Sequence, residues 1–449
     1  MKVLLISANT LTTPYPVYPL GLDHVANAIS SDHDVRIADV NALGGIEPLI
    51  RIIDSFDPDV IGMSLRNIDN TDQTDQQSFI AEYQRLAGLI RKATRATLVL
   101  GGSGFTLFPD EMMAMLGADY GIVGEGERLA DLLRSMEKKA PIVGIPGVVT
   151  PKGSKDIPPP LAGPYSRKQL PESTHLQYYL KNGGMLNLQT KRGCPFRCIY
   201  CTYPHIEGRK LRLISPEAAA KDASRLEAAG AKYFFVTDSV FNSHTDHSMA
   251  VAEAFIAAGL KIPWGAFFAP MEPPRGYFEL MAQAGLTHAE FGTESMCDAV
   301  LDRYGKPFHT KDVYNAHQAA IGAGLYVSHF FLLGGPGEDR DSIDETLSNI
   351  EKLNRSVFFF FPALRIYPHT DLYDIAVGER QISVSRNLLE PCFYASHKIP
   401  RDEILERLET HGAKRPNWVV GAGGEATAEI VARLYERGHT GPLWEHLIQ

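Results

Sequence analysis

The stretch "TKRGCPFRCIYCTYPH", residues 190–205, contains three of the chain's five cysteines, Cys194, Cys198 and Cys201. Structural zinc sites usually take four protein ligands, often from paired Cys-x-x-Cys knuckles, whereas this set stops at three. Three thiolates in a loop after a strand suit an iron–sulfur cluster, and on a cubane they leave one iron open to another ligand. A zinc site completed by a distant residue such as His205, or a coincidence of small buried thiols, is the alternative.

Residues 1–140 alternate short β-branched runs with amphipathic stretches. The pattern predicts strands at 3–7, 35–40, 60–64, 97–100 and 120–123, with helices at 20–31, 46–56, 78–93, 108–116 and 127–137. This alternation indicates an α/β, Rossmann-like, doubly wound sheet whose ligands lie beyond the carboxyl ends of its strands. The glycine-rich stretches "LGGSGFT" (100–106) and "VGEGE" (123–127) fall at those ends.

Pro and Gly then become frequent without periodicity, which predicts a linker over 141–185. A second strand–helix series follows over 186–370. It predicts strands near 186–190, 233–238, 263–269, 288–292, 326–333 and 356–367, with helices at 216–230, 246–259, 276–285, 311–324 and 341–354. Six such units indicate a partial (β/α)6 barrel with its chemistry at the carboxyl ends of the strands. Residues 371–449 form a small, mostly helical C-terminal region in this interpretation.

The composition is that of an ordinary globular protein, with 44% hydrophobic residues over 449 positions. No apolar run approaches the roughly 18 residues of a membrane span. The first apolar residues are too few for a signal peptide, so we expect a cytoplasmic protein whose cysteines bind metal or act in catalysis. A net charge of −9 argues against a broad phosphate-binding surface, so we expect no nucleic-acid partner.

The stretch "CPFRCIYC" (194–201) resembles the cluster loop of the radical S-adenosylmethionine (SAM) superfamily, in which a Cys-x3-Cys-x2-Cys set binds a 4Fe–4S cluster. The resemblance implies that Cys194, Cys198 and Cys201 hold the cluster and that the amino and carboxylate groups of SAM chelate its open iron. It further implies reductive cleavage of SAM to methionine and a 5′-deoxyadenosyl radical, with electrons from an external donor of the flavodoxin or ferredoxin type.

Further stretches resemble the SAM-binding elements of that superfamily, in the expected order. "FFVTDSVFN" (234–242) lies where a Gly-Gly-Glu motif holds the SAM amino group, a departure common in the cobalamin-linked branch; "EFGTES" (290–295) and "FFLLGGPGED" (330–339) end later strands, and "RIYPHTDLYD" (365–374) resembles the closing strand. The residues that the resemblance implies for SAM are Tyr200 at the adenine, Thr237, Asp238 and Ser239 at the amino group, Glu294 and Ser295 at the ribose or carboxylate, and Gly334 and Gly335 beside the adenine.

The first domain resembles the cobalamin-binding domain that precedes the barrel in cobalamin-dependent radical SAM enzymes, through "YPVYPLGLDHVANAI" (15–29), "GGSGFTLFP" (101–109) and "DYGIVGEGE" (119–127). Glycine-rich turns at a sheet edge would let a corrin lie against the backbone. A domain of this fold that binds nothing, or a nucleotide, is the alternative. The implied cobalamin-binding residues are Tyr18, Leu20, Gly21, Ser64, Arg66, Gly101, Gly102, Ser103, Thr106, Gly124, Glu125 and Gly126.

Arg66 is the residue that we expect beneath the corrin. No Asp-x-His-x-x-Gly motif is present, so we expect no histidine ligand on the lower face of cobalt. An arginine is a poor ligand because its guanidinium does not deprotonate. An arginine in a comparable place in tryptophan C-methylating relatives is thought to favour a nucleophilic, four-coordinate cobalamin, which gives Arg66 a catalytic role by resemblance. A surface arginine paired with Asp69 or Asp72 is the alternative.

The resemblance implies a methyltransferase that moves a methyl group from SAM via methylcobalamin to a carbon of its substrate, by a radical or, through Arg66, a polar route. A cyclase or oxidoreductase with the same cofactors and a non-catalytic cobalamin-binding module are the alternatives. The segment "VFFFFPALRIY" (357–367) is either the lining of an apolar cavity or a buried strand. We expect a small or apolar, lipid-like substrate.

Overall fold

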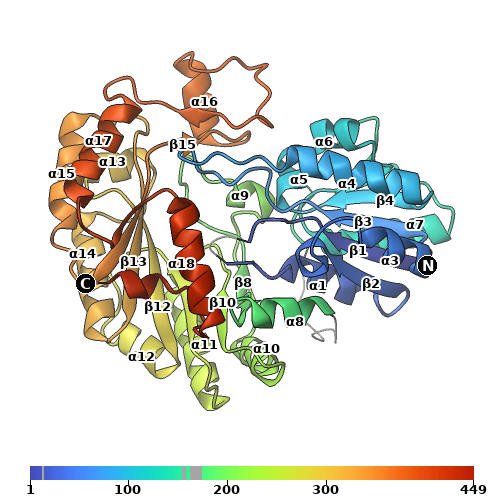
Figure 1. Cartoon of the computed structure of the whole chain (residues 1–449), viewed down its shortest axis with the longest axis horizontal. Coiled ribbons are helices and arrows are strands. Elements are labelled where there is room, and N and C mark those ends of the chain that lie inside the picture. The colour runs from blue at the N-terminus through green and yellow to red at the C-terminus, as the bar shows by residue number, and fades with distance from the viewer. Residues whose placement is uncertain (13–14, 154–157, 162–173, 449) are drawn as a thin grey trace. The chain divides into compact units, whose positions relative to one another are not determined.

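The computed structural model describes residues 1–12, 15–153, 158–161 and 174–448 (Figure 1). The chain divides into two compact units. The N-terminal unit comprises Met1–Asn70, Ser78–Asn182 and His205–Gly208. The C-terminal unit comprises Thr71–Gln77, Gly183–Pro204 and Arg209–Gln449. Each unit has its own sheet, and each is described by itself.

The N-terminal unit is built on a sheet with strand order β2-β1-β3-β4-β5-β6. Strands β1 (Lys2–Ser7), β2 (Asp34–Asp39), β3 (Val60–Ser64), β4 (Thr97–Gly101) and β5 (Tyr120–Ile122) are parallel, and β6 (Val148–Val149) pairs antiparallel with β5. Strand β1 is buried on both faces, as expected where helices cover both sides of a parallel sheet. The predicted Rossmann-like fold is therefore confirmed.

Helices of this unit follow the strands in alternation: α1 (Leu20–Ile29), α2 (Val40–Leu43), α3 (Leu49–Phe56), α4 (Ile80–Ala93), α5 (Ser103–Leu107), α6 (Pro109–Leu116), η1 (Gly126–Arg128), α7 (Leu129–Glu137) and α8 (Thr174–Lys181). The range predicted as a linker contains β6 and α8, while its residues 154–157 and 162–173 lie outside the described residues. Helix α8 belongs to the core because Tyr179 donates a 3.1 Å hydrogen bond to buried Asp39.

The C-terminal unit contains a seven-stranded parallel sheet with the order β17-β14-β13-β12-β11-β10-β7. The strands are β7 (Met185–Leu188), β10 (Tyr233–Val236), β11 (Trp264–Phe268), β12 (Leu286–Glu294), β13 (Tyr326–Leu332), β14 (Ser356–Phe361) and β17 (Trp418–Val420). Six of them follow the prediction. The seventh corrects it: β17 comes from the region predicted as mostly helical and pairs in parallel with β14.

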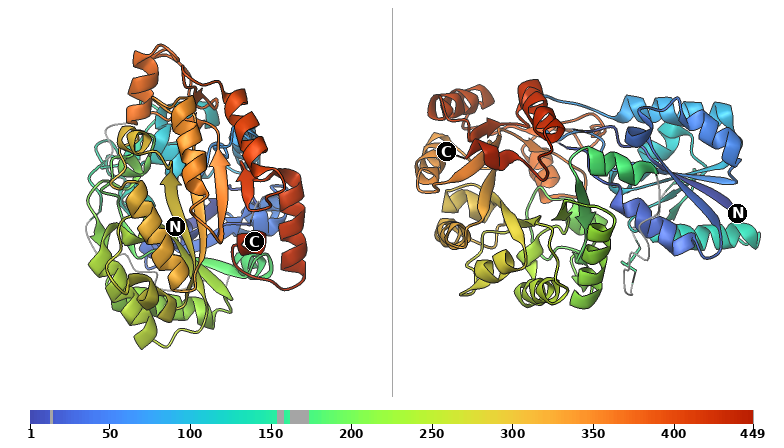
Figure 2. Two further views of the ribbon diagram at one scale, coloured as in Figure 1. Left: turned by 90° about the vertical axis from the view of Figure 1, so that its left-hand side faces the viewer. Right: turned by 60° about the horizontal axis from the view of Figure 1, so that its bottom comes forward.

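The remaining elements of the unit are β8 (Lys191–Arg192), α9 (Tyr203–Ile206, of which His205 and Ile206 group with the N-terminal unit), β9 (Arg212–Leu213), α10 (Pro216–Ala228), η2 (Phe241–Ser243), α11 (Thr245–Ala257), α12 (Tyr277–Gln283), α13 (Asp298–Arg303), α14 (Thr310–Gly322), α15 (Arg340–Ile350), β15 (Leu364–Arg365), α16 (Asp371–Gly378), β16 (Phe393–Tyr394), α17 (Arg401–Gly412), α18 (Gly424–Glu436) and η3 (Trp444–Leu447). Figure 2 shows this unit from two further sides. The stretch 365–374, predicted as a closing strand, instead enters α16.

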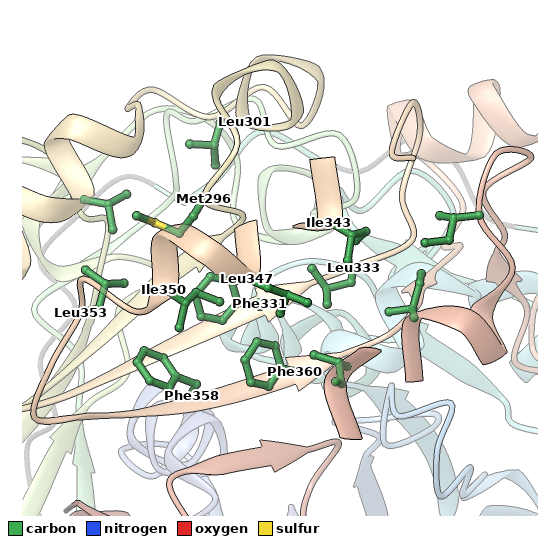
Figure 3. Close-up of a cluster of buried hydrophobic side chains, with 14 of the residues drawn as sticks. Met296, Leu301, Phe331, Leu333, Ile343, Leu347, Ile350, Leu353, Phe358 and Phe360 are labelled. Carbon is green, nitrogen blue, oxygen red and sulfur yellow. The ribbon is translucent and has the colours of Figure 1, made fainter. Parts of the chain in front are cut away.

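The outer face of the sheet packs on the helices that connect its strands. Phe331, Phe358 and Phe360 project from β13 and β14 onto Leu347 and Ile350 of α15 (Figure 3). Alternation along a strand then places the residues between them, such as Phe359, on the opposite, inner face. None of the described helices is long and apolar enough to cross a membrane.

Candidate active site

The three-cysteine loop begins at a buried ion pair. Lys191 Nζ lies 2.7 Å from Asp238 Oδ2, with their side chains 1% and 0% exposed. Asp238 also accepts hydrogen bonds from the backbone N–H groups of Thr190 (2.7 Å) and Lys191 (3.2 Å) and from the Thr190 hydroxyl (2.5 Å). Lys191 Nζ also donates a 2.7 Å hydrogen bond to the Phe241 carbonyl. The carboxylate that the sequence assigned to the SAM amino group is thus buried against the start of the loop.

The three thiols are close enough to affect one another electrostatically. Burial, and then the charges of Cys198 and Cys194, raise the pKa of the Cys201 thiol to about 12, while Lys306 and the Tyr203 N–H oppose the rise. Among the described residues no three His, Cys, Asp or Glu side chains converge on a point that a single metal ion would need. A cubane takes one thiolate for each of three irons, so this donor set fits a 4Fe–4S cluster.

The segment that follows α13 contacts the backbone of the three-cysteine loop. The Ile199 N–H donates to the Tyr304 carbonyl at 3.1 Å. Gly305 has φ +70°, and a Cβ there would lie 2.4 Å from the Arg197 carbonyl oxygen, so only glycine lets the two backbones approach this closely. The Tyr304 hydroxyl donates to Glu338 Oε2 (2.7 Å), which also accepts from the Gly335 N–H (2.8 Å).

Gly335 and Glu338 therefore connect the predicted glycine turn to the cluster loop. A Cβ on Gly335 would meet the Tyr304 hydroxyl at 2.1 Å, and Gly334 has φ +82°. Burial raises the pKa of Glu338 to about 7, against the hydrogen bonds from Tyr304 and from the backbone, which lower it. Glu338 was not predicted as a site residue, although it directly follows the "GGPG" turn (334–337).

The sequence did not reveal Lys306, whose charge interacts with those of Cys198 and Cys201. Its Nζ lies 2.9 Å from Glu294 Oε1, with side-chain exposures of 7% and 10%, and 5.3 Å from the centre of the Tyr200 ring. The charges of Glu294, Cys198 and Cys201 raise the pKa of Lys306 against the effect of burial. Glu294 sits at φ +64°, a conformation uncommon for a residue with a side chain, at a register shift of β12. Glu294, Tyr200 and Lys306 thus form one cluster beside the thiols.

The other predicted SAM residues differ in whether their side chains hydrogen-bond to other described residues. The Ser239 hydroxyl is buried with no hydrogen-bond partner in the described part of the chain. Thr237 donates through its hydroxyl to the Leu188 carbonyl at 3.1 Å. Ser295 is fully buried, 3.0 Å from the Thr346 hydroxyl, and accepts from the Cys297 N–H. Ser295 therefore faces the protein interior.

In the N-terminal unit the loops after β3, β4 and β5 come together. Gly102 has φ +101°, and a Cβ there would lie 2.6 Å from the Leu65 carbonyl oxygen. The Ser103 hydroxyl donates to the Arg66 carbonyl at 2.7 Å. The Thr106 hydroxyl donates to the Gly102 carbonyl (2.9 Å) and accepts from the Gly124 N–H (3.0 Å). These backbone approaches leave a glycine-lined edge that suits a large flat cofactor.

Arg66 is exposed at this edge, and within the unit it forms no ion pair with a described residue, Asp69 included. Asp72, the other predicted alternative partner, groups with the C-terminal unit and accepts from the Thr74 and Ala422 N–H groups at 2.7 and 2.8 Å. Arg66 thus lies exposed in the loop after β3, and its role at cobalamin stays a prediction.

The remaining predicted cobalamin residues are distributed differently. Ser64 ends β3 as predicted, Gly101 ends β4 one residue beyond the predicted strand, Leu20 begins α1, and Gly21 is exposed with open space around it. Tyr18 is buried, with its hydroxyl 3.0 Å from Asp23 Oδ2 and 3.2 Å from His175 Nε2. Glu125 is buried and accepts from the Leu161 N–H, and Gly126 lies against Val25. Tyr18 and Glu125 hold the unit together.

Comparison with known families assigns both units. The B12 binding domain model matches residues 6–134, and the radical SAM superfamily model matches residues 188–350. The chain is a cobalamin-dependent radical SAM enzyme. The cofactors of this family are a 4Fe–4S cluster, SAM and cobalamin. Both predicted cofactor-binding edges fall within the matched ranges.

Relatives span most of the chain. The "Uncharacterized methyltransferase PH0819" of Pyrococcus horikoshii is 25% identical over 394 residues, covering 84% of this chain and 83% of its own. The tryptophan 2-C-methyltransferase of Streptomyces laurentii is 23% identical, covering 82% and 73%. The structure of the radical SAM methyltransferase TsrM from Kitasatospora setae, with tryptophan and a SAM analogue bound, has a TM-score of 0.88 at 20% identity and covers 99% of this chain and 97% of its own. The last likeness shows the fold.

Proposed function

We propose that the enzyme transfers a methyl group from SAM, by way of cobalamin, to a carbon of a small apolar substrate. The observation that carries the proposal is that the chain holds both a supported three-thiol loop and a glycine-lined edge with an exposed arginine. The methyltransferases among its relatives support the same reaction class. When bound, the cluster supplies electrons for SAM cleavage and cobalamin supplies a methyl carrier.

The chain's own residues hold and orient these groups. Cys194, Cys198 and Cys201 would hold the cluster, with Lys306 providing a positive charge beside the thiolates. The Ser239 hydroxyl, which has no hydrogen-bond partner among the described residues, and the Glu294–Lys306 pair are the groups that we propose to contact the polar atoms of SAM. Asp238, with no exposed oxygen, positions the loop instead.

Arg66 is the residue that we propose would contact cobalamin at the glycine-lined edge without coordinating cobalt. Its guanidinium forms no ion pair with a described residue of the unit and cannot serve as a ligand itself. Its backbone is held by Ser103, so the side chain projects from a fixed position. An arginine that cannot coordinate cobalt would suit polar methyl transfer to a nucleophilic carbon of the substrate.

The test is product analysis of the reconstituted enzyme with titanium(III) citrate, deuteromethyl SAM and hydroxocobalamin. We expect S-adenosylhomocysteine to form only when cobalamin is added, and little of it from an Arg66→Met variant. As a control we choose Arg85→Met on α4. S-Adenosylhomocysteine independent of cobalamin, or a candidate substrate converted to a product with no gain of the labelled methyl group, would refute methyl transfer and favour an oxidoreductase.

A further inference from the structure

The inner face of the C-terminal sheet carries a continuous row of phenylalanine rings. Phe235 of β10 lies 5.0 Å from Phe267 of β11, Phe267 lies 6.2 Å from Phe330 of β13, and Phe330 stacks on Phe359 of β14 at 4.9 Å and 14°. Strand β12 passes between β11 and β13 with Gly292 in register with Phe330, and Glu294 Oε1 lies 3.1 Å from the position that a Cβ on Gly292 would take. We call these four residues the aromatic row.

The aromatic row is partly open rather than packed away. Phe267 is 39% exposed although it lies in the middle of a parallel sheet, and Phe330 and Phe359 are half-buried. Their neighbours on the other face behave differently: Phe331, Phe358 and Phe360 are at most 4% exposed, against the helices. Rings left accessible on an inner sheet face carry a hydration cost that an apolar ligand would remove.

Two polar groups lie in register within this apolar face. Glu290 is paired with Phe267 on one side and with Ser328 on the other, so all three side chains share the inner face. The only hydrogen bond that described residues give Glu290 comes from Trp444 Nε1, at 2.9 Å. Ser328 is fully buried, and its hydroxyl has no partner among the described residues. A buried hydroxyl without a partner is rare, which points to a ligand that completes the bonding of Ser328.

Residues near the end of the described chain close this face at one side. Trp444 packs with Val357, Val419 and the partly buried Phe359, and thereby joins the carboxyl group of Glu290 to the aromatic row. Burial raises the pKa of Glu290 to about 7, so at neutral pH this acid is not a fixed anion that demands a cation.

We propose that the aromatic row binds a flat, uncharged ring system of the substrate, with Glu290 and Ser328 taking a hydrogen bond from an N–H or O–H group on that ring. The inference rests on the proposed function for the statement that the bound molecule is the methyl acceptor. Because Phe330 and Phe359 stack on each other, contact with the remaining face of one of these rings would fix the plane of the ligand, and the polar pair would fix its rotation within that plane.

Binding of 2-naphthol to the full-length, reconstituted enzyme tests the proposal by equilibrium dialysis without SAM turnover. We expect saturable binding at one site per chain, about fivefold tighter than that of the saturated decahydro-2-naphthol, since ring stacking is lost in the latter. We also expect binding about fivefold tighter than that of 2-methylnaphthalene, which lacks the hydrogen-bond donor.

Variants on the two faces of one strand separate binding from folding. Phe359→Leu should weaken 2-naphthol binding about fivefold, whereas Phe360→Leu, on the opposite face, should change it less than about twofold despite a loss of stability. Phe267→Leu, at an exposed position, gives a second test that leaves the core intact. Absence of saturable binding, equal losses in the Phe359 and Phe360 variants, or tighter binding of naphthalen-2-ylmethylammonium would overturn the proposal.

The two proposals fail in distinguishable ways. If 2-naphthol binds as described but S-adenosylhomocysteine does not form, the aromatic site stands and methyl transfer falls. If S-adenosylhomocysteine forms in a cobalamin-dependent way but none of the aromatic probes binds, the methyltransferase stands and the ring-binding site falls.

Discussion

Replacing Asp238 with asparagine tests whether this residue positions the cluster loop or contacts SAM directly. The substitution Asp238→Asn keeps the shape of the side chain but removes the charge that faces Lys191 at 2.7 Å. Lys191 would then be a buried ammonium whose neighbours among the described residues, the introduced amide and the carbonyl and ring of Phe241, carry no negative charge. Removing one partner of a buried ion pair costs about 3–5 kcal/mol, because the other charge stays buried without compensation. We expect a loss of that size in the unfolding free energy of the C-terminal unit.

The assay is urea unfolding of the full chain, followed by tryptophan fluorescence, since all three tryptophans lie in the C-terminal unit. The matched control is Asp341→Asn, an exposed residue of the first turn of α15, which should change stability by less than about 0.5 kcal/mol. Because Asp238 holds Thr190 and Lys191 directly before Cys194, we also expect the variant to retain less iron after gel filtration than the wild type.

A different result would restore the role in SAM binding that the sequence suggested. If Asp238→Asn loses less than about 1 kcal/mol and keeps its iron, yet binds SAM more weakly in equilibrium dialysis, the carboxylate contacts SAM and the positioning role is refuted.

Three further predictions concern other parts of the two units. Lys306→Met removes the positive charge beside Cys201, so we expect a chelator to remove iron faster than from the exposed control Lys311→Met. Gly102→Ala should lower the unfolding free energy by at least about 2 kcal/mol and abolish cobalt retention, because residue 102 has φ +101° and its Cβ would lie 2.6 Å from the Leu65 carbonyl oxygen. The control Gly117→Ala, at φ +59° with open space around the Cβ, should lower it by about 1 kcal/mol. Glu338→Gln should make the unfolding free energy less dependent on pH, because the pKa of Glu338 is raised to about 7 in the folded state. The wild-type acid stabilises the fold fully below about pH 4.5, and up to about 3 kcal/mol of this stabilisation is lost as the pH rises to 7. Urea unfolding at pH 5 and pH 8 would measure the difference, and equal slopes in both proteins would contradict the prediction.

The order of strands and helices could be predicted because each long element has its own periodicity. Strand β17 could not, because three residues, Trp418–Val420, are too few to show alternation and become a strand only through pairing with β14. Helix α8 was hidden for a similar reason: its sequence follows a Pro-rich stretch, and tertiary contacts such as that of Tyr179 with Asp39 include it in the core.

The candidate site was predictable where a motif fixes residue type and spacing, as in the three cysteines. The site was less predictable where the interaction partner of a site residue is distant in sequence. Nothing next to Asp238 in sequence shows that Lys191, 47 residues earlier, takes its charge, or that Lys306 pairs with Glu294. For the aromatic stretch 357–367 the sequence leaves open a cavity lining or a buried strand. The structure shows strand β14, in which Phe358 and Phe360 pack on helices while Phe359 faces inward, and a cavity lining stays a prediction.

The central claim is that one chain holds both a cluster and cobalamin, and a measurement of metal content tests it most directly. The enzyme would be purified without oxygen, reconstituted with iron, sulfide and hydroxocobalamin, and desalted before iron, sulfide and cobalt are quantified. We predict about four irons and one cobalt per chain, with iron lost and cobalt retained when Cys194, Cys198 and Cys201 are replaced by alanine. Four irons without cobalt would contradict the account, since the N-terminal unit would then serve another ligand.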